Sequence, residues 1–175
     1  MASPGCLILC KSVHHGNTAK VATAIAAVLH AEIASPEEVP YTSLEGRPLV
    51  GFGSGVYYGR MHDALFEWLH GLPDVPEAVL PAFLFSTAGL PWLSWLWHGP
   101  LCRLLARKGF RVVGEFSCGG YDTWGPLWLI KGLNKKHPDD RDLARAEEFA
   151  AGIVRVLWSS EAVSQARMAH PQALP

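Results

Sequence analysis

The sequence repeats one pattern four times: a short apolar run, a loop rich in glycine and hydroxyl side chains, and then a helical pattern. The apolar runs cover residues 6–10, 49–53, 80–85 and 111–116. Continuous apolar runs of this length are typical of strands that are buried on both faces, as in a parallel sheet covered by helices. A weaker run at residues 31–34 predicts a fifth strand, which is short and lies at an edge.

Apolar residues at helical spacing predict the segments between the strands. We expect these helices within residues 21–29, 61–69, 100–109 and 138–157. Pro100 suits the first position of the third helix and Gly109 suits its end, while Asp139 and Asp140 suit the first turn of the last helix. Strand followed by helix, repeated, predicts an α/β fold: a doubly wound five-stranded parallel sheet with helices on both faces.

The bulk composition fits one folded domain. The chain has 175 residues, of which 49% are hydrophobic and 18% charged, so it can bury a sizeable core. We expect residues 1–158 to form this domain and residues 159–175 to form a loosely ordered tail. A formal net charge of -1 supplies no basic field that would attract nucleic acid.

The cysteine pattern and the apolar stretches bear on the compartment. The four cysteines form no CxxC pair, which favours reduced thiols in the cytoplasm. The N-terminus shows no signal-peptide pattern. The longest apolar stretch, residues 89–97, is too short to span a bilayer and is interrupted by Pro91, with Pro100 close behind. We therefore expect a cytoplasmic protein without membrane insertion.

The loops that leave the four strong strands are the expected binding loops, because ligands of open α/β sheets bind at the carboxyl ends of the strands. The first of them, residues 12–18, joins a buried strand to an amphipathic helix. Its backbone N–H groups at a helix N-terminus, with Ser12, Asn17 and Thr18 as neutral donors, indicate a phosphate site. The alternative interpretation is an ordinary capped start of a helix.

Three of these loops resemble those of the flavodoxin family, in the same order along the chain. The first loop matches the flavodoxin phosphate pattern at Ser12, His15, Gly16, Asn17 and Thr18. The loop Gly55-Val56-Tyr57-Tyr58-Gly59 is similar to the second flavin loop, and Thr87-Ala88-Gly89 stands at the position of the third. The order of elements agrees with that family from Cys6 to about Leu157. The resemblance implies the strand order 2-1-3-4-5.

The resemblance further implies that the cofactor is flavin mononucleotide (FMN), with its phosphate on residues 12–18 and its ring between the second and third loops. The residues expected to bind it are Ser12, His14, His15, Gly16, Asn17, Thr18, Ser54, Gly55, Val56, Tyr57, Tyr58, Gly59, Thr87, Ala88, Gly89, Gly120, Tyr121 and Trp124. Tyr57 and Tyr58 are the aromatic candidates of the second loop. Since the third loop lacks an aromatic residue before Trp92, Tyr121 or Trp124 is expected to take that place.

Other chemistries have weaker support. The adjacent pair His14-His15 lacks a third ligand at suitable spacing, so we predict no metal site. Ser54 stands in no nucleophile elbow, so we predict no hydrolase and no catalytic residue. Cys118 is read as a buried small residue rather than a redox thiol. Trp92, Trp95 and Trp97 either form a hydrophobic lip for an acceptor or belong to the core.

Three functions fit these observations. The first is a flavodoxin-like protein that shuttles electrons to a redox partner protein; its near-neutral charge then calls for a partner with a weakly charged or apolar face. The second is a small FMN-dependent oxidoreductase acting on a quinone, a protoporphyrinogen-like substrate or another small-molecule electron acceptor, with Asp122, Tyr121 or His62 relaying a proton. The third is a binding domain without flavin. The sequence allows a monomer or a homodimer.

Overall fold

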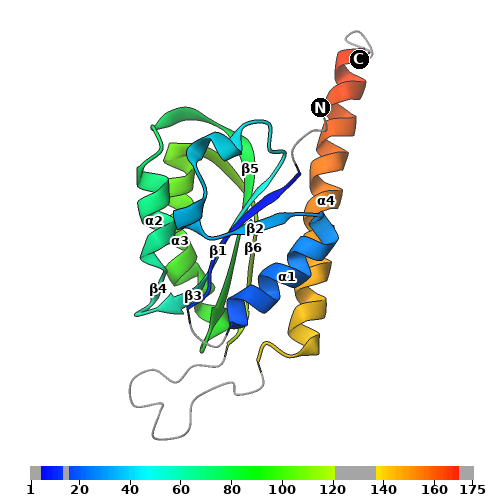
Figure 1. The fold of residues 1–175 in the computed structure, drawn as a ribbon. Helices are drawn as coiled ribbons and strands as arrows, with labels where there is room; N and C mark the ends of the chain where they lie inside the picture. Colours follow the sequence, from blue (N-terminus) through cyan, green and yellow to red (C-terminus); the bar gives the residue numbers. More distant parts are fainter. Residues whose placement is uncertain (1–4, 14–15, 121–136, 170–175) are drawn as a thin grey trace, which may run out of the picture.

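A computed structural model describes residues 5–13, 16–120 and 137–169 (Figure 1). The elements in chain order are β1 (Leu7–Lys11), α1 (Asn17–Leu29), β2 (Glu32–Ala34), η1 (Pro36–Glu38), η2 (Tyr41–Leu44), β3 (Val50–Tyr57), β4 (Arg60–Met61), α2 (Asp63–His70), β5 (Val75–Ala88), η3 (Pro91–Leu93), α3 (Ser94–Arg107), β6 (Lys108–Gly119) and α4 (Asp140–Ala169).

The sheet has the predicted order. Its path runs β2-β1-β3-β5-β6, and every neighbouring pair on this path is parallel. The five strands correspond to the five predicted ones, so the doubly wound arrangement is confirmed. The structure adds the two-residue strand β4, which pairs antiparallel with the end of β3. Because the five strands of this path are parallel, their carboxyl ends lie at the same edge of the sheet. The loops that follow the strands can therefore contribute to one binding site at that edge.

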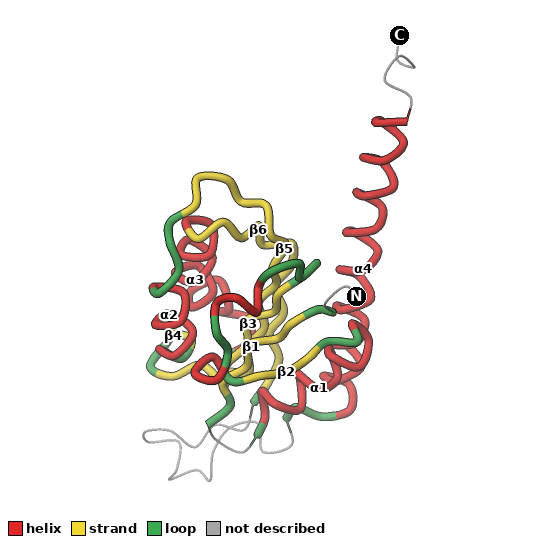
Figure 2. The backbone as a smooth tube through the Cα atoms, turned by 45° about the horizontal axis from the view of Figure 1, so that its top comes forward, coloured by secondary structure: helices red, strands yellow, loops and turns green. Residues whose placement is uncertain are grey.

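Helices cover both faces of this sheet. Figure 1 and Figure 2 show α1 and α4 on one side and α2 and α3 on the other. Each face has its own core. Phe52, Leu84 and Trp97 belong to the α2–α3 side, whereas Phe83 and Phe85 belong to the α1–α4 side. Alternation of side chains along β5 produces this division, since neighbouring residues of a strand point to opposite faces.

Two glycines of β3 make room for aromatic rings of β5. A Cβ atom on Gly51 would lie 2.4 Å from the Phe83 ring, and one on Gly53 would lie 2.0 Å from the Phe85 ring. Both phenylalanines are fully buried. The glycine spacing in this strand therefore serves close packing between β3 and β5.

Two helix ends differ from the sequence prediction. Helix α3 begins at Ser94, so Pro100 lies inside it rather than at its first position. Burial of Trp97, His98 and Leu101 against the sheet holds the helix together across the backbone hydrogen bond that proline cannot make. Gly109 lies within β6 at φ 84°, with Val75 beside it, and does not end the helix.

The second helix begins later than predicted. Met61 belongs to β4, and α2 starts at Asp63 after His62, whose Nδ1 accepts a hydrogen bond from the backbone N–H of Ala64 at 3.1 Å. His62 is therefore the N-cap of α2. The His62 ring also contacts the Tyr57 ring edge-on, with 5.4 Å between the two centroids. Capping α2 and packing on Tyr57 give His62 a structural role, which is an alternative to the proton relay suggested for it.

Helix α4 continues past Trp158 to Ala169 and extends beyond the body of the domain (Figure 1). The boundary between the domain and the tail therefore falls within one helix and stays a prediction. Residues 121–136 lie outside the described residues. Within the described parts of the chain, no helix combines the length and the apolar character needed to cross a membrane.

Candidate functional site at the carboxyl edge of the sheet

The strand order reverses beside β1, which lies between β2 and β3. The chain leaves β1 toward α1 on one face of the sheet, and it leaves β3 and β5 toward α2 and α3 on the other. The loops after β1, β3 and β5 therefore diverge at one edge, where α/β sheets bind their ligands. Most of the predicted site residues of the described chain lie at this edge.

Within its described part, the first loop presents one polar side chain without a partner beside a helix start without a side-chain cap. The Oγ atom of Ser12 is buried and has no hydrogen-bond partner among the residues that the structure describes. Gly16, at φ 66°, is the N-cap of α1 and supplies no side chain to the first turn. Asn17 and Thr18 are buried at the start of that helix, and its first turn carries no acidic residue. An uncapped helix start beside an unpartnered hydroxyl fits an anion.

The charge beside this loop is already neutralised. Lys11, the last residue of β1, forms an ion pair with Glu37 of η1. Ser35 also donates to Glu37, and these two hydrogen bonds lower the pKa of the Glu37 carboxyl to about 2. Among the described residues of the loop, the groups left to bind an anion are neutral. His14 and His15 lie outside the described residues.

A hydroxyl pair joins the first loop to the third. Thr18 Oγ1 and Thr87 Oγ1 lie 2.8 Å apart, and both side chains are buried. Thr87 comes from β5 and Thr18 from the first turn of α1, so this contact crosses 69 residues of sequence. The predicted phosphate loop and the predicted third flavin loop are therefore directly connected.

The second loop is a tight hairpin between β3 and β4. Tyr57 pairs with Arg60, which leaves Tyr58 and Gly59 as the two turn residues. Both have positive φ, 53° and 75°, as a type I′ turn requires. A tyrosine in the left-handed region is strained, and such strain is concentrated at functional sites. The Tyr58 side chain is 81% exposed at the carboxyl edge.

The base of this hairpin is fixed by a buried serine. Ser54 Oγ donates to the carbonyl of Gly55 at 2.8 Å and accepts from the backbone N–H of His62 at 3.0 Å. The Tyr57 ring folds over Gly55, where a Cβ atom would lie 2.8 Å from its hydroxyl oxygen. The same hydroxyl accepts a long hydrogen bond of 3.4 Å from the N–H of Val13 in the first loop. Val56 pairs with Met61 across the hairpin.

The third and fourth loops meet at the ends of β5 and β6. The backbone N–H of Gly120 donates to the carbonyl of Ala88 at 3.1 Å. A Cβ atom on Gly120 would lie 3.0 Å from Thr87, so a side chain there would press on the third loop. Gly89, which follows Ala88 in the third loop, is half-buried. Tyr121 and Trp124, the aromatic residues predicted for the fourth loop, lie outside the described residues.

The tryptophans after the third loop divide between surface and core. Trp92 is 70% and Trp95 68% exposed, with Leu90 and Leu96 also exposed, whereas Trp97 is buried. No charged residue occurs between Gly89 and Cys102. This exposed group, which we call the Trp92–Trp95 surface, is apolar and uncharged at the point where the chain leaves the carboxyl edge. Large exposed apolar side chains together indicate an interaction surface.

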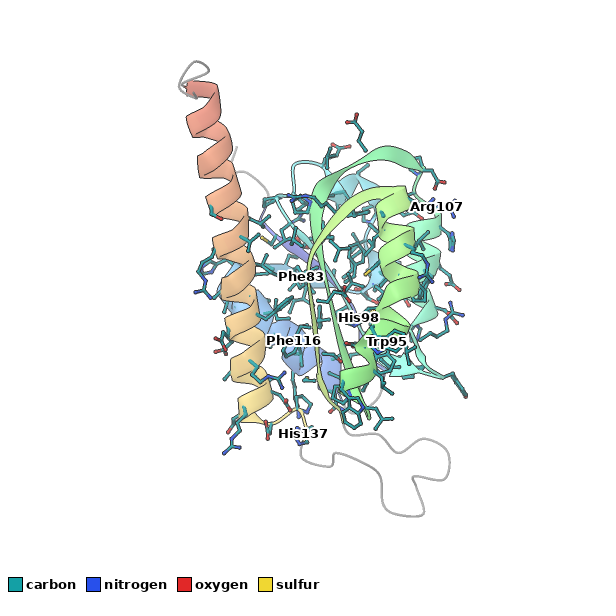
Figure 3. All side chains as sticks on the ribbon, turned by 180° about the vertical axis from the view of Figure 1, so that it is seen from behind. Phe83, Trp95, His98, Arg107, Phe116 and His137 are labelled. Carbon is teal, nitrogen blue, oxygen red and sulfur yellow. The ribbon has the colours of Figure 1, made fainter. Side chains whose placement is uncertain are left out.

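Sequence reasoning missed a buried polar network below this surface. Ser86 Oγ lies 3.1 Å from Trp97 Nε1, 2.9 Å from His98 Nε2 and 3.0 Å from Ser117 Oγ. His98 Nδ1 lies 2.8 Å from a Glu115 carboxylate oxygen. Figure 3 shows His98 on the side of α3 that faces the strands. The sequence signal for this network was a single histidine within the apolar run from Trp95 to Leu101.

A second histidine–carboxylate pair lies where the chain enters α4 (Figure 3). His137 Nδ1 lies 2.5 Å from Asp142 Oδ2, and the His137 ring packs on Gly119 at the end of β6. Asp139 Oδ1 accepts the N–H groups of Arg141 and Asp142, which caps the helix. These groups satisfy one another and begin α4 firmly beside the last strand.

Cys118 is buried between β6 and α4. Burial raises the pKa of its thiol to about 12, and the nearby Asp142 carboxylate adds to this effect. The thiolate, which is the reactive form, is therefore strongly disfavoured. This agrees with the interpretation of Cys118 as a packing residue.

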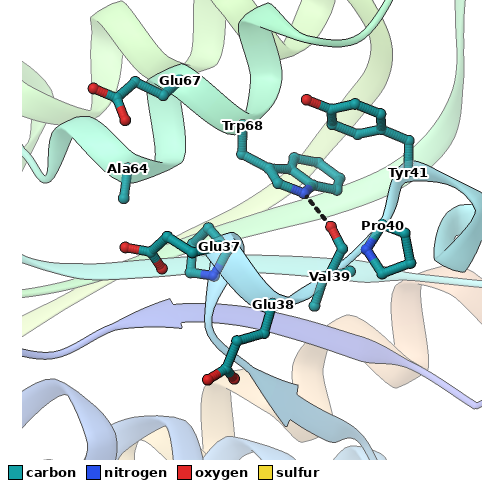
Figure 4. A pocket seen from close by; sticks show the side chains of 9 residues that line it. Glu37, Glu38, Val39, Pro40, Tyr41, Ala64, Glu67 and Trp68 are labelled. Atoms are coloured by element: carbon teal, nitrogen blue, oxygen red, sulfur yellow. Dashed lines mark hydrogen bonds between the residues drawn. The ribbon is translucent and has the colours of Figure 1, made fainter.

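A separate pocket of about 550 Å³ lies between the η1–η2 segment and α2 (Figure 4). Its lining includes Glu38, Glu67 and Tyr41, and Trp68 forms one wall with its Nε1 donating to the carbonyl of Val39 at 2.8 Å. None of the residues predicted to bind FMN lines it.

Comparisons with known proteins agree with this architecture. A family model described as Flavodoxin domain matches residues 7–80. An uncharacterized protein of Methanocaldococcus jannaschii is 44% identical over 149 residues, which cover 85% of this chain and 97% of that protein.

Solved flavodoxin structures share the fold. A flavodoxin from the domain Archaea has a TM-score of 0.60 and 16% identity, covering 87% of this chain and 97% of that one. Oxidised flavodoxin 1 from Bacillus cereus has a TM-score of 0.61 and 18% identity, covering 86% and 97%. The order of strands, the position of the loops and the matched family model lead to one conclusion: this chain belongs to the flavodoxin-like family.

Proposed function

We propose that the chain binds FMN at the carboxyl edge and transfers electrons to a partner redox protein. The observation that carries this proposal is the buried, unpartnered Oγ of Ser12 beside the uncapped N-terminus of α1. A buried hydroxyl without a partner costs about 1–3 kcal/mol, so a ligand oxygen at this position would remove a standing penalty. Phosphate is the ligand group that such a helix start accepts best.

The phosphate would be held by Ser12, Gly16, Asn17 and Thr18, with His14 and His15 completing the loop. Neutral donors and backbone N–H groups suit a phosphate monoester, since Lys11 is already paired with Glu37. The Thr18–Thr87 contact supports a ligand that extends from the first loop to the third.

The ring would lie between the second and third loops, Ser54–Gly59 and Thr87–Gly89. Tyr58 is the aromatic residue best placed to cover it, because its side chain is exposed and its turn holds it at the edge of the sheet. Gly59 has no atom within 4 Å of a Cβ position, so its peptide has room to turn. Gly120, Tyr121 and Trp124 are proposed for the opposite side.

Bound FMN would supply reversible one- or two-electron redox chemistry. The protein supplies the phosphate cradle, a covering tyrosine and the Trp92–Trp95 surface. That surface carries no charge of its own, so docking on it would depend on apolar burial rather than on long-range steering. We propose a partner protein whose docking face is likewise apolar.

The alternative is an FMN-dependent oxidoreductase that acts on a small molecule such as a quinone. The exposed rings of Trp92 and Trp95 favour it, because flat apolar acceptors bind well against aromatic side chains. Only the reaction of the reduced protein distinguishes the two functions.

We propose the cytoplasm as the location, since Cys6, Cys10, Cys102 and Cys118 are all free thiols. A monomer or a homodimer is compatible with this function.

The test is the visible spectrum of the purified protein, followed by anaerobic titration with dithionite. The electron-transfer proposal expects bound FMN and a long-wavelength semiquinone band at half reduction. Bound FMN that passes directly to the two-electron form, with rapid reoxidation by a soluble quinone, would favour the oxidoreductase. A protein that binds neither its own nor added FMN would contradict both.

A further inference from the structure

Ser86 has a complete set of hydrogen bonds, and this determines where each proton lies. Trp97 Nε1 can only donate, so it donates to Ser86 Oγ at 3.1 Å. An ionised Glu115 only accepts, so the proton on Nδ1 of His98 points to it at 2.8 Å. Nε2 of the neutral imidazole then carries the lone pair, and the Ser86 hydroxyl donates to it at 2.9 Å. Ser117 donates to the remaining lone pair of Ser86.

A second proton on His98 conflicts with this arrangement. Nε2–H would then point at Ser86 Oγ, whose two lone pairs already accept from Trp97 and Ser117. The Ser86 hydroxyl would have to turn toward Ser117 and reverse that contact. The imidazole is fully buried, so its charge would also be poorly hydrated. Burial lowers the pKa of His98, and the partner Glu115 opposes this effect only in part.

The charged and titratable groups around His98 are few. Glu115 of β6 is the one that bonds to it, and its side chain is 45% exposed at the edge of the sheet. Cys102 lies one turn further along α3 and also contacts Glu115; Arg103 lies beside it. Strand β5 contributes Ser86 to the network; its titratable residue, Glu77, stands near the other end of the strand, with its backbone beside Gly109. On β4, Arg60 is paired with Asp63 of α2.

The network is attached to the proposed binding site on both sides. Ser86 directly precedes Thr87, whose hydroxyl meets Thr18 of the phosphate loop on the opposite face of the sheet. Trp97 and His98 directly follow the exposed residues Trp95 and Leu96. Two neighbouring residues of β5 therefore tie its end to α3 on one face and to α1 on the other.

We propose that His98 is a positioning residue: in its neutral form, braced by Glu115, it holds the third loop against α3 through Ser86, and acid releases this hold and weakens FMN binding. This inference rests on the proposed function. It assigns to His98 and Glu115 a proton-dependent control of the site that a purely structural core histidine would not exert.

The test measures the dissociation constant of FMN by flavin fluorescence between pH 5 and 8, in wild-type protein and in His98→Gln. Glutamine keeps an acceptor for Ser86 and cannot become charged. The FMN phosphate itself takes up a proton near pH 6, so the quantity compared is the difference between the two pH profiles. At the acid end, we expect the FMN affinity of the wild type to fall about tenfold more than that of the variant. A tenfold difference corresponds to a pKa of His98 that is about one unit lower in the FMN-bound protein than in the FMN-free protein.

Two further variants separate positioning from misfolding. Glu115→Gln keeps the hydrogen-bond acceptor of Nδ1 but removes the charge that favours the imidazolium, so the acid transition should move to lower pH. His70→Gln, at the exposed end of α2, is the matched histidine control and should leave the profile unchanged. A two-bond ¹H–¹⁵N spectrum of the flavin-free protein should show His98 as the Nδ1–H tautomer at pH 7.

The outcomes distinguish the two proposals. If wild-type protein binds no FMN at any pH, the proposed function fails and this inference fails with it. If FMN binds tightly but the profiles of wild type, His98→Gln and Glu115→Gln coincide, the positioning role alone is overturned. An Nε2–H tautomer at pH 7 would also overturn it.

Discussion

Thr18 and Thr87 lie 69 residues apart in sequence, yet their hydroxyl oxygens meet at 2.8 Å inside the protein. One belongs to the first turn of the helix that begins the proposed phosphate site, and the other to the strand that ends beside the proposed ring site. The pair therefore fixes the spacing of two loops that a single ligand would have to span.

Replacing both partners of this pair should cost less than the sum of the two single replacements. Thr87→Val leaves the buried Thr18 hydroxyl without its partner, which we expect to lower the free energy of unfolding by about 1–3 kcal/mol. The double variant Thr18→Val with Thr87→Val should lose less than the sum of the two single changes. Urea denaturation of the flavin-free proteins measures this cycle. Thr23→Val, on the exposed face of α1, is the control. Additive losses would mean that the two hydroxyls do not interact.

Ser12→Ala should weaken FMN binding without weakening the fold. The buried Ser12 hydroxyl has no hydrogen-bond partner among the described residues, so its removal from the flavin-free protein should relieve that penalty and raise the free energy of unfolding by about 1–3 kcal/mol. A hydrogen bond to a charged phosphate is worth about 1.5–3 kcal/mol, so FMN affinity should fall about tenfold or more. Riboflavin, which lacks the phosphate, is the control ligand. Equal losses for FMN and riboflavin would place the phosphate elsewhere.

Tyr58→Gly should change stability and flavin binding in opposite directions. Tyrosine at φ 53° is strained, and glycine in the left-handed region is not. We expect the free energy of unfolding to rise by about 1 kcal/mol, because the cost of a left-handed residue is about 1–2 kcal/mol and glycine loses more backbone entropy. Flavin affinity should fall, since the exposed ring is the proposed cover. Thermal unfolding of the flavin-free protein and a flavin titration give the two values. A loss of stability would show that the ring, rather than the turn, holds the hairpin.

Gly53→Ala should destabilise the core, whereas Gly152→Ala should not. A methyl group on Gly53 would lie 2.0 Å from the Phe85 ring, and overpacking of this kind costs about 1–3 kcal/mol. Gly152 lies within α4 with no atom within 4 Å of its Cβ position, so alanine should add about 0.5–1 kcal/mol through its helix propensity. Chemical denaturation compares the two. Similar values for both variants would contradict the packing of β3 on β5.

Acid should destabilise the flavin-free protein through His98. Its pKa is lowered in the folded protein, so the unfolded chain binds more protons as the pH falls below the ordinary histidine value of 6.5. The stabilising contribution of neutral His98 is therefore complete above pH 6.5 and is lost progressively toward the folded-state pKa. We expect His98→Gln to show a shallower loss of unfolding free energy between pH 6.5 and 5 than wild type. Parallel curves for the two proteins would mean that His98 does not titrate differently on folding.

The sequence by itself determined the class of fold and the positions of the main loops at the carboxyl edge of the sheet. Buried parallel strands are continuous apolar runs, and amphipathic helices repeat their apolar positions every three to four residues, so both signals lie within one segment. Ser12–Thr18 and Thr87–Gly89 could be located because a parallel sheet brings the carboxyl ends of its strands to one edge. The hairpin residues Gly55–Gly59 were found in the same way, although β4 was too short to detect.

Tertiary structure alone decided the contacts between these segments. Pro100 has the sequence signature of a helix start, but burial of Trp97 and His98 against the sheet carries α3 across it. Ser86, His98 and Glu115 stand on three different elements and are individually unremarkable in sequence, so no local pattern predicts that they share one set of hydrogen bonds. Long-range polar contacts depend on strand register and helix placement, and these are set by the packing of the whole domain.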